Sequence, residues 1–258
     1  MIRSQTRFLS RPGKADIAYV YTPPANGYQD KPVVMFCGGF RSDMQGTKAT
    51  YLEEMCRENG QGYIRFDYSG HGKSGGDFKD CTISTWFDDA CAVLDTLPDC
   101  PVVIVGSSMG GWIALLLAKC RPERIKGIIG VAAAPDFTQR LYEEELSAQQ
   151  REIVERQGQI EIPNDYSDEP YIFTKKLFDD GADNFVLNSQ SDVGFPIYLF
   201  HGISDTVVPL EAPLKIKEKY KINGADGVEV EFIDGGDHSL SRPQDLEALW
   251  RKVIDFSL

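Results

Sequence analysis

Residues 101–118 read PVVIVGSSMGGWIALLLA and join a strand pattern directly to a helix pattern. The β-branched run 102–105 predicts a short buried strand, and the apolar run 111–118 predicts a buried helix. Ser108 falls on the turn between them, inside a Gly-x-Ser-x-Gly motif. Such a turn projects the serine hydroxyl above the end of the strand, and its glycines allow the close packing that the turn requires. We therefore predict that Ser108 is a nucleophile.

A second Gly-x-Ser-x-Gly match, residues 72–76, lacks this setting. No apolar strand leads directly into Ser74 and no apolar helix follows it, so its glycine-rich surroundings predict a loop. Its first three residues, Gly72-Lys73-Ser74, are similar to the end of a phosphate-binding loop, but Asp67 stands where that motif needs its first glycine. Ser107 lies in the same turn as Ser108 but has no glycine two residues earlier, and we interpret it as a serine that bonds to backbone.

A serine hydroxyl needs a base that accepts its proton, and the chain has three histidines, His71, His201 and His238. On the order nucleophile, acid, base, the histidine follows the serine, which excludes His71. His238 lies in a glycine-rich loop after the last expected strand, where its ring can reach over the edge of the sheet. His201 ends a strand, and we interpret it as structural. We therefore predict that His238 is the base.

The base in turn needs an acid that orients its ring. Asp205 follows the expected strand 196–200 and lies between Ser108 and His238 in the chain, which is the expected order. Asp136, after the preceding strand, is the main rival. Asp237 is adjacent to the histidine and is poorly placed to align the ring. We predict that Asp205 is the acid.

Acyl transfer also requires donors for the negative charge that develops on the carbonyl oxygen. The backbone N–H after the nucleophile belongs to Met109. The second donor is expected in the loop after the strand 32–36, where we assign it to the N–H of Phe40. Cys37, in the same loop, is interpreted as a small buried side chain rather than a second nucleophile.

Strand and helix patterns alternate along the chain, which predicts a predominantly parallel α/β sheet with helices on both faces. The expected strands are 6–9, 15–21, 32–36, 62–67, 101–105, 125–134, 196–200 and 228–233, and the expected helices are 47–59, 84–97, 111–118 and 242–258. Residues 136–194 interrupt this alternation, because they are charged, helix-forming and carry no strong buried strand. We predict that they form a small helical cap, inserted in a core made of residues 1–135 and 195–258.

Composition narrows the class of protein. A length of 258 residues fits one α/β domain, and no apolar run is long enough for a membrane-spanning helix. A net charge of −12 argues against nucleic acid and against anionic membranes as partners. The first residues, Met1 to Arg7, lack the apolar core of a signal peptide, and the six cysteines contain no Cys-x-x-Cys pair. We therefore expect reduced thiols and a cytoplasmic location.

The sequence resembles the α/β-hydrolases over nearly its full length. It is most similar to the branch that contains the mitochondrial acyl-protein thioesterase which also cleaves acyl glucuronides. The segments that carry the resemblance are 37–40, 64–72, 106–112, His201-Gly202 with Asp205, Asp237-His238, and 45–49. The resemblance implies an α/β-hydrolase fold and a triad of Ser108, Asp205 and His238. It also leads us to expect a bacterial relative of that branch.

The expected activity is the hydrolysis of carboxylic esters or thioesters through an acyl-enzyme, with a small molecule or an acylated protein as substrate. We expect no metal and no organic cofactor. A peptidase or C–C bond hydrolase with the same triad, and a ligand sensor on the same fold, are the alternatives. Some apolar residues of the expected cap should line an acyl pocket; the candidates are Leu141, Tyr142, Ile153, Tyr171, Phe173, Leu177 and Phe178. The oligomeric state does not follow from the sequence.

Overall fold

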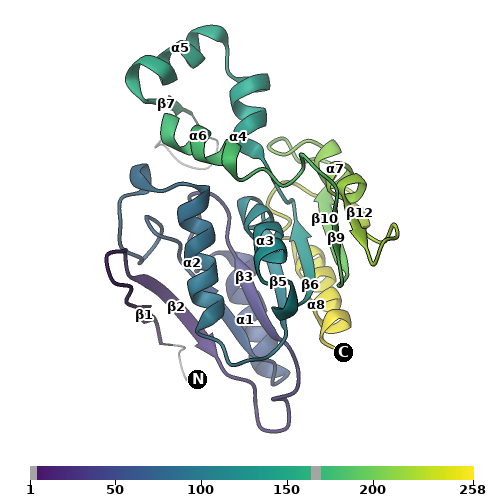
Figure 1. The fold of residues 1–258 in the computed structure, drawn as a ribbon. Coiled ribbons are helices and arrows are strands. Elements are labelled where there is room, and N and C mark those ends of the chain that lie inside the picture. The colour runs from purple at the N-terminus through teal and green to yellow at the C-terminus, as the bar shows by residue number, and fades with distance from the viewer. Residues whose placement is uncertain (1–4, 164–169) are drawn as a thin grey trace.

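A central sheet organises the chain (Figure 1). The computed structural model describes residues 5–163 and 170–258, and over these residues the sheet has eight strands. Their order is β1 (Arg7–Leu9), β2 (Ile17–Thr22), β4 (Tyr63–Phe66), β3 (Val33–Cys37), β5 (Val102–Ser107), β6 (Ile125–Val131), β10 (Ile197–Gly202) and β12 (Glu229–Ile233). The pairs β1–β2 and β2–β4 are antiparallel, and the remaining neighbours are parallel. The carboxyl ends of β3, β5, β6, β10 and β12 therefore meet at one edge.

Helices cover both faces of this sheet. On one face, α1 (Thr47–Glu58) and α8 (Pro243–Ser257) pack against Val34 and Val103, and on the other, α2 (Ile83–Asp95) and α3 (Met109–Cys120) pack against Val33 and Val102. Successive residues of a strand point to opposite faces, so a strand that is buried on both faces must be apolar throughout. The continuous apolar runs of β3 and β5 meet this requirement, and the predicted α/β sheet is confirmed.

The remaining elements beside the central sheet are short. They are the 3₁₀ turns Phe78–Asp80 and Pro122–Arg124, helix α7 (Glu211–Lys219), and the parallel pair β9 (Ser191–Val193) and β11 (Tyr220–Ile222). The strand expected at 125–134 ends at Val131, because Ala132 adopts a φ of 46° and the chain leaves the sheet there. A left-handed residue cannot continue a strand.

The segment between β6 and β10 stands apart from the central sheet (Figure 1). It contains α4 (Phe137–Arg140), a π-helical turn (Leu141–Glu145), α5 (Ala148–Gln157) and α6 (Lys175–Asp183), together with the antiparallel hairpin β7 (Gln159–Ile162) and β8 (Tyr171–Thr174). The hairpin was not expected from the sequence. Its strands have four residues each and are partly exposed, so they lack the apolar run that marks a buried strand.

The turn at Ser108 packs backbone against backbone. Ser108 has a φ of 53° and a ψ of −119°, a conformation that an L-residue rarely adopts. A Cβ atom on Gly110 would lie 2.0 Å from the carbonyl oxygen of Cys37, and one on Gly106 would lie 2.5 Å from the carbonyl oxygen of Gly110. The glycines of the motif are therefore required by the contact between β3, β5 and the start of α3.

We expect Gly110→Ala to lower the free energy of unfolding by about 3 kcal/mol or more, since the added methyl meets rigid backbone and overpacking of this kind costs about 1–3 kcal/mol even where the neighbours can move. Gly75→Ala is the matched control, because its Cβ would make only ordinary contacts with Ala15. Urea unfolding of both variants is the measurement. A Gly110→Ala protein as stable as the control would contradict the packing described for the turn.

Candidate active site

Three loops at the carboxyl edge of the sheet bring Ser108, His238 and Asp205 together. Ser108 follows β5, Asp205 follows β10, and His238 lies between β12 and α8. The Nε2 atom of His238 is 3.2 Å from the Oγ of Ser108, and its Nδ1 is 2.8 Å from the Oδ2 of Asp205. Since an ionised carboxylate only accepts, Nδ1–H donates to Asp205 and Nε2 is left to accept the serine proton. This is the arrangement of an activated nucleophile.

Asp205 is held as an anion beneath the histidine ring. Its side chain is fully buried, and its Oδ1 accepts hydrogen bonds from the N–H groups of Val207 (2.8 Å) and Val208 (2.9 Å). Burial alone raises the pKa of Asp205, but the hydrogen bonds from His238, Val208 and Val207 outweigh it, and the net pKa is lowered. The carboxylate can therefore orient the ring and stabilise its charged form.

The rival residues have other partners. The carboxylate of Asp136 accepts from the backbone N–H groups of Val186 and Leu187, and Asp237 accepts from the N–H of Leu240. His201 is fully buried; its Nε2 is 3.0 Å from the carbonyl oxygen of Val208 and 3.7 Å from Asp205.

The second serine motif also has a structural environment. The Oγ of Ser74 donates to the carbonyl oxygen of Asp67 (2.6 Å) and accepts from the N–H of Ala18 (2.8 Å). Cys37 is fully buried, and burial raises the pKa of its thiol to about 12. Neither side chain is therefore presented as a nucleophile.

The loop after β3 lies directly beside Ser108. A Cβ atom on Gly39 would be 3.3 Å from the Cβ of Ser108, so this loop runs close beside the serine, and Phe40 is the next residue along it. Met109 is the first residue of α3, where backbone N–H groups have no acceptor within the helix. The two predicted oxyanion donors thus come from two different elements, Phe40 from the loop after β3 and Met109 from the start of α3.

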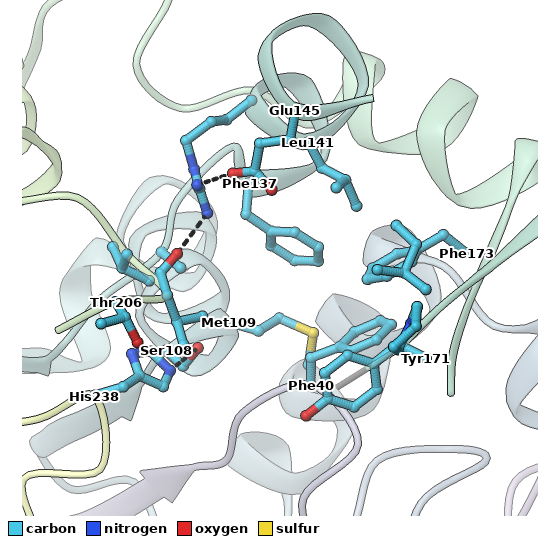
Figure 2. A pocket seen from close by; sticks show the side chains of 16 residues that line it. Phe40, Ser108, Met109, Phe137, Leu141, Glu145, Tyr171, Phe173, Thr206 and His238 are labelled. Carbon is cyan, nitrogen blue, oxygen red and sulfur yellow. Dashed lines mark hydrogen bonds and ion pairs between the residues drawn. The ribbon is translucent and has the colours of Figure 1, made fainter. Parts of the chain in front are cut away.

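A cavity of about 370 Å³ opens above Ser108 and His238 (Figure 2). Figure 2 shows Tyr171 and Phe173 on the opposite side of this cavity from His238. Of the seven apolar residues singled out in the sequence, Leu141, Tyr171 and Phe173 are among those that line it. The others pack elsewhere: Leu177 and Phe178 belong to the buried core, for example, and Ile153 is 38% exposed. An apolar cavity of this size suits a small organic ligand or an acyl chain.

Arg140 contributes a polar contact to the cavity that no sequence pattern indicated. Its guanidinium pairs with Glu145 and donates to the carbonyl oxygen of Val207 at 3.0 Å. The N–H on the far side of that peptide group belongs to Val208 and donates to Asp205. The charged Arg140 thereby polarises the peptide group between Val207 and Val208. This strengthens the hydrogen bond from Arg140 to the carbonyl oxygen and the one from the N–H to Asp205. An isolated arginine in a charged segment carries no signal of such a role.

A second cavity, of about 280 Å³, reaches Ser108 and His238 from the side of the loop after β3. Its lining is more polar and includes Ser42, Asp43 and Lys48. Lys48 donates to the carbonyl oxygen of Ser239, and burial lowers the pKa of its ammonium group to about 8. Ser108 therefore lies between an apolar and a polar cavity.

Over the described residues, no group of three or more His, Cys, Asp or Glu side chains could hold a metal ion. No helix in this part of the chain is long and apolar enough to cross a bilayer.

The fold and this site define a class. The family described as alpha/beta hydrolase fold matches residues 31–170, which is more than half of the chain. The protein therefore belongs to the α/β-hydrolase family, and the predicted fold class is confirmed.

Particular relatives can be named. Human palmitoyl-protein thioesterase ABHD10, mitochondrial, is 33% identical over 98% of this chain and 80% of its own length. Among solved structures, a putative hydrolase from Agrobacterium vitis S4 superimposes with a TM-score of 0.91 at 38% identity, covering 99% of both chains. Mouse alpha/beta hydrolase domain-containing protein 10 superimposes with a TM-score of 0.88 at 30% identity, covering 98% of both chains.

These relatives confirm the predicted branch and the predicted reaction class: the protein is a hydrolase of esters or thioesters. They correct the expected location. The mammalian relatives are mitochondrial, which contradicts a cytoplasmic assignment. That assignment rested on the cysteine pattern and the absence of a signal peptide. The cysteine pattern predicts reduced thiols, but thiols stay reduced in more than one compartment, so the pattern does not identify the location.

His71 should make the protein less stable as the pH is lowered from 7 to 5. Burial lowers the pKa of His71 to about 4, against about 6.5 for an exposed histidine. Between these values the unfolded chain binds the extra proton, so acidification favours unfolding, by about 2 kcal/mol over this interval. The measurement is urea unfolding at both pH values.

His71→Phe supplies the comparison for this pH effect. The variant should be less stable at pH 7, because the N–H of Arg41 and the carbonyl oxygen of Ser69, which are hydrogen-bonded to His71, are left unpaired, but it should lose less stability on acidification. An equal loss in both proteins would show that His71 is not the group responsible.

Proposed function

We propose that this protein is a serine hydrolase that removes acyl groups from acylated proteins or small acyl esters and thioesters. Ser108 is the nucleophile, His238 the base and Asp205 the orienting acid. The observation that carries the proposal is the chain of contacts from Ser108 Oγ to His238 Nε2 (3.2 Å) and from His238 Nδ1 to Asp205 (2.8 Å) at the floor of an apolar cavity. The name of the human relative, a palmitoyl-protein thioesterase, supports an acylated protein as substrate.

The reaction has two steps. In the first, Ser108 attacks the carbonyl carbon while His238 takes its proton, and the N–H groups of Phe40 and Met109 stabilise the oxyanion. The tetrahedral intermediate collapses with loss of the alcohol or thiol, which receives the proton from His238. In the second step, water attacks the acyl-enzyme by the same route, releasing the acid and restoring the serine.

The two cavities indicate how a substrate lies across the nucleophile. The apolar cavity, lined in part by Leu141, Tyr171 and Phe173, suits the acyl group, and the polar cavity beside Lys48 suits the leaving group. In this arrangement residues 136–194 act as the cap on a core of 1–135 and 195–258, and they supply much of the surface that the acyl chain meets. Residues 164–169 of this cap lie outside the described residues.

Substitution of the three residues tests the assignment. Ser108→Ala should abolish turnover and labelling by a fluorophosphonate probe, and His238→Ala and Asp205→Asn should lower kcat by about 10³-fold or more. Ser74→Ala is the control and should keep nearly full turnover and labelling. Labelling that persists in Ser108→Ala, or a folded Asp205→Asn protein with full kcat beside an inactive Asp136→Asn, would require a different assignment.

The acyl group should determine the rate. Each methylene buried in the cavity contributes about 0.8 kcal/mol, so kcat/KM should rise about three- to fourfold per methylene until the cavity is full. The measurement is kcat/KM for ester and thioester series from acetyl to palmitoyl, with matched amides to test for peptidase activity. A flat dependence on chain length would rule out an apolar acyl site.

The charge of the leaving group should matter as well. Residues 136–192 carry 14 acidic and 5 basic side chains, so a polyanionic leaving group should be disfavoured, more strongly at low salt. We expect an acyl-CoA to react more slowly than a neutral thioester with the same acyl group, and the difference to shrink as salt is added. Faster reaction of the acyl-CoA would contradict the electrostatic argument.

A further inference from the structure

The loop after β3, residues 38–46, supplies the Phe40 N–H and is held in place by side chains from β4 and the loop that follows it. The Nε2 of His71 accepts from the backbone N–H of Arg41 at 3.1 Å, and the Oδ1 of Asp67 accepts from the N–H of Met44 at 2.6 Å. Arg65 donates to the carbonyl oxygen of Met44. The contact from His71 is the one nearest to Phe40, a single residue away.

The backbone at this contact is strained. Arg41 has a φ of 59°, in the left-handed region that non-glycine residues rarely occupy. Strain of this kind persists only where the surroundings hold it, and it often accompanies a functional constraint. The hydrogen bond from the Arg41 N–H to His71 is one such restraint. Rotation about Arg41 would change the path of the loop beside Ser108.

His71 is built as a fixed acceptor. Its side chain is 4% exposed, and its ring packs edge-on against Tyr68, Phe78 and Trp86. Its Nδ1 lies 3.1 Å from the carbonyl oxygen of Ser69, which can only accept, so Nδ1 carries the proton and Nε2 presents a lone pair to Arg41. Burial lowers the pKa of His71 to about 4, and the ring therefore remains neutral at physiological pH.

The aromatic packing joins His71 to Phe40 by a second route. The ring of Phe78 packs against both His71 and Phe40, with centroid distances of 5.2 and 5.0 Å, and Trp86 contacts the same two rings. The side chain of Phe40 is thus held by two of the rings that pack against His71. Its backbone is held by the hydrogen bond of the next residue, Arg41, to His71.

We propose that His71 is a positioning residue for the oxyanion hole, which aligns the Phe40 N–H by accepting a hydrogen bond from the adjacent N–H of Arg41. The inference rests on the proposed function, because it takes Phe40 as an oxyanion donor. His71 does not contact the reacting atoms and transfers no proton. Its loss affects the transition state more than the bound substrate, since the negative charge on the oxygen develops only as the serine attacks.

Two substitutions of similar polarity distinguish loss of the hydrogen bond to Arg41 from loss of the packing of the His71 ring. In His71→Gln the longer side chain carries an amide oxygen near the position of Nε2, within reach of the Arg41 N–H. In His71→Asn the shorter side chain reaches only the level of Nδ1. We expect His71→Asn to lose about 10- to 100-fold in kcat, with KM changed less than threefold, and His71→Gln to recover most of the loss.

The second readout is binding of an alkyl trifluoromethyl ketone, which adds to the serine and places an oxyanion in the hole. Its affinity should fall in His71→Asn by the same factor as kcat/KM, and remain near the original value in His71→Gln. Ser74→Ala serves as the control, because it breaks hydrogen bonds in the same loop without touching Arg41; it should lose stability while keeping kcat and ketone affinity.

Three results would overturn the proposal. They are full kcat in a folded His71→Asn protein, an equal fall of kcat in the Asn and Gln variants, or a rise in KM with kcat unchanged. These results are distinct from failure of the proposed function, which would appear as turnover that survives Ser108→Ala. Folding of each variant is checked by urea unfolding, so the comparison of kcat is made between native proteins.

Discussion

The strained backbone at Ser108 is the constraint on which the rest of the site depends. A residue at a φ of 53° between a strand and a helix is held because its neighbours leave no alternative: its N–H donates to Val131 on β6, and its carbonyl oxygen accepts from Ala134 and Gly111. The contact of Gly110 with the carbonyl of Cys37 requires β3 and α3 to approach without side chains between them. One turn thus fixes the relative positions of β3, β5, β6 and α3.

Parallel strands convert that local geometry into a site. Because the carboxyl ends of β3, β5, β10 and β12 meet at one edge, the loops that follow them come together although they are far apart in the sequence. Each loop supplies a group of different chemistry: a backbone donor, a hydroxyl, a carboxylate and an imidazole. Hydrogen bonds also tie these loops to their surroundings, as in the contact of Lys48 of α1 with Ser239 and that of His71 with Arg41.

The sequence predicts those parts of the structure that depend on local pattern or chain order. Ser108 is marked by the strand and helix on either side of it, and His238 and Asp205 follow from the order of the loops. The hairpin β7–β8 is not predictable in this way, because its short, half-exposed strands carry no continuous apolar run. The roles of Arg140 and His71 are also hidden, since each acts on backbone groups distant in the sequence, and such contacts have no periodicity. The location was mispredicted because composition reports redox state and charge rather than compartment.

Phe40 links the loop beside Ser108 to the segment between β6 and β10. It lies in that loop, while its ring stacks on Phe173 of β8 with a centroid distance of 5.1 Å and packs edge-on against Tyr171 and Phe137. The same residue therefore lines the apolar cavity and belongs to the loop that His71 restrains. A substitution that moves β8 would therefore act on the loop beside Ser108 through this aromatic stack. Since aromatic side chains of this size dominate packing energy, the position of the loop after β3 depends on β8 and α4 as well as on the central sheet. The segment between β6 and β10 is in this sense part of the site, because it packs against Phe40, which lines the cavity above Ser108.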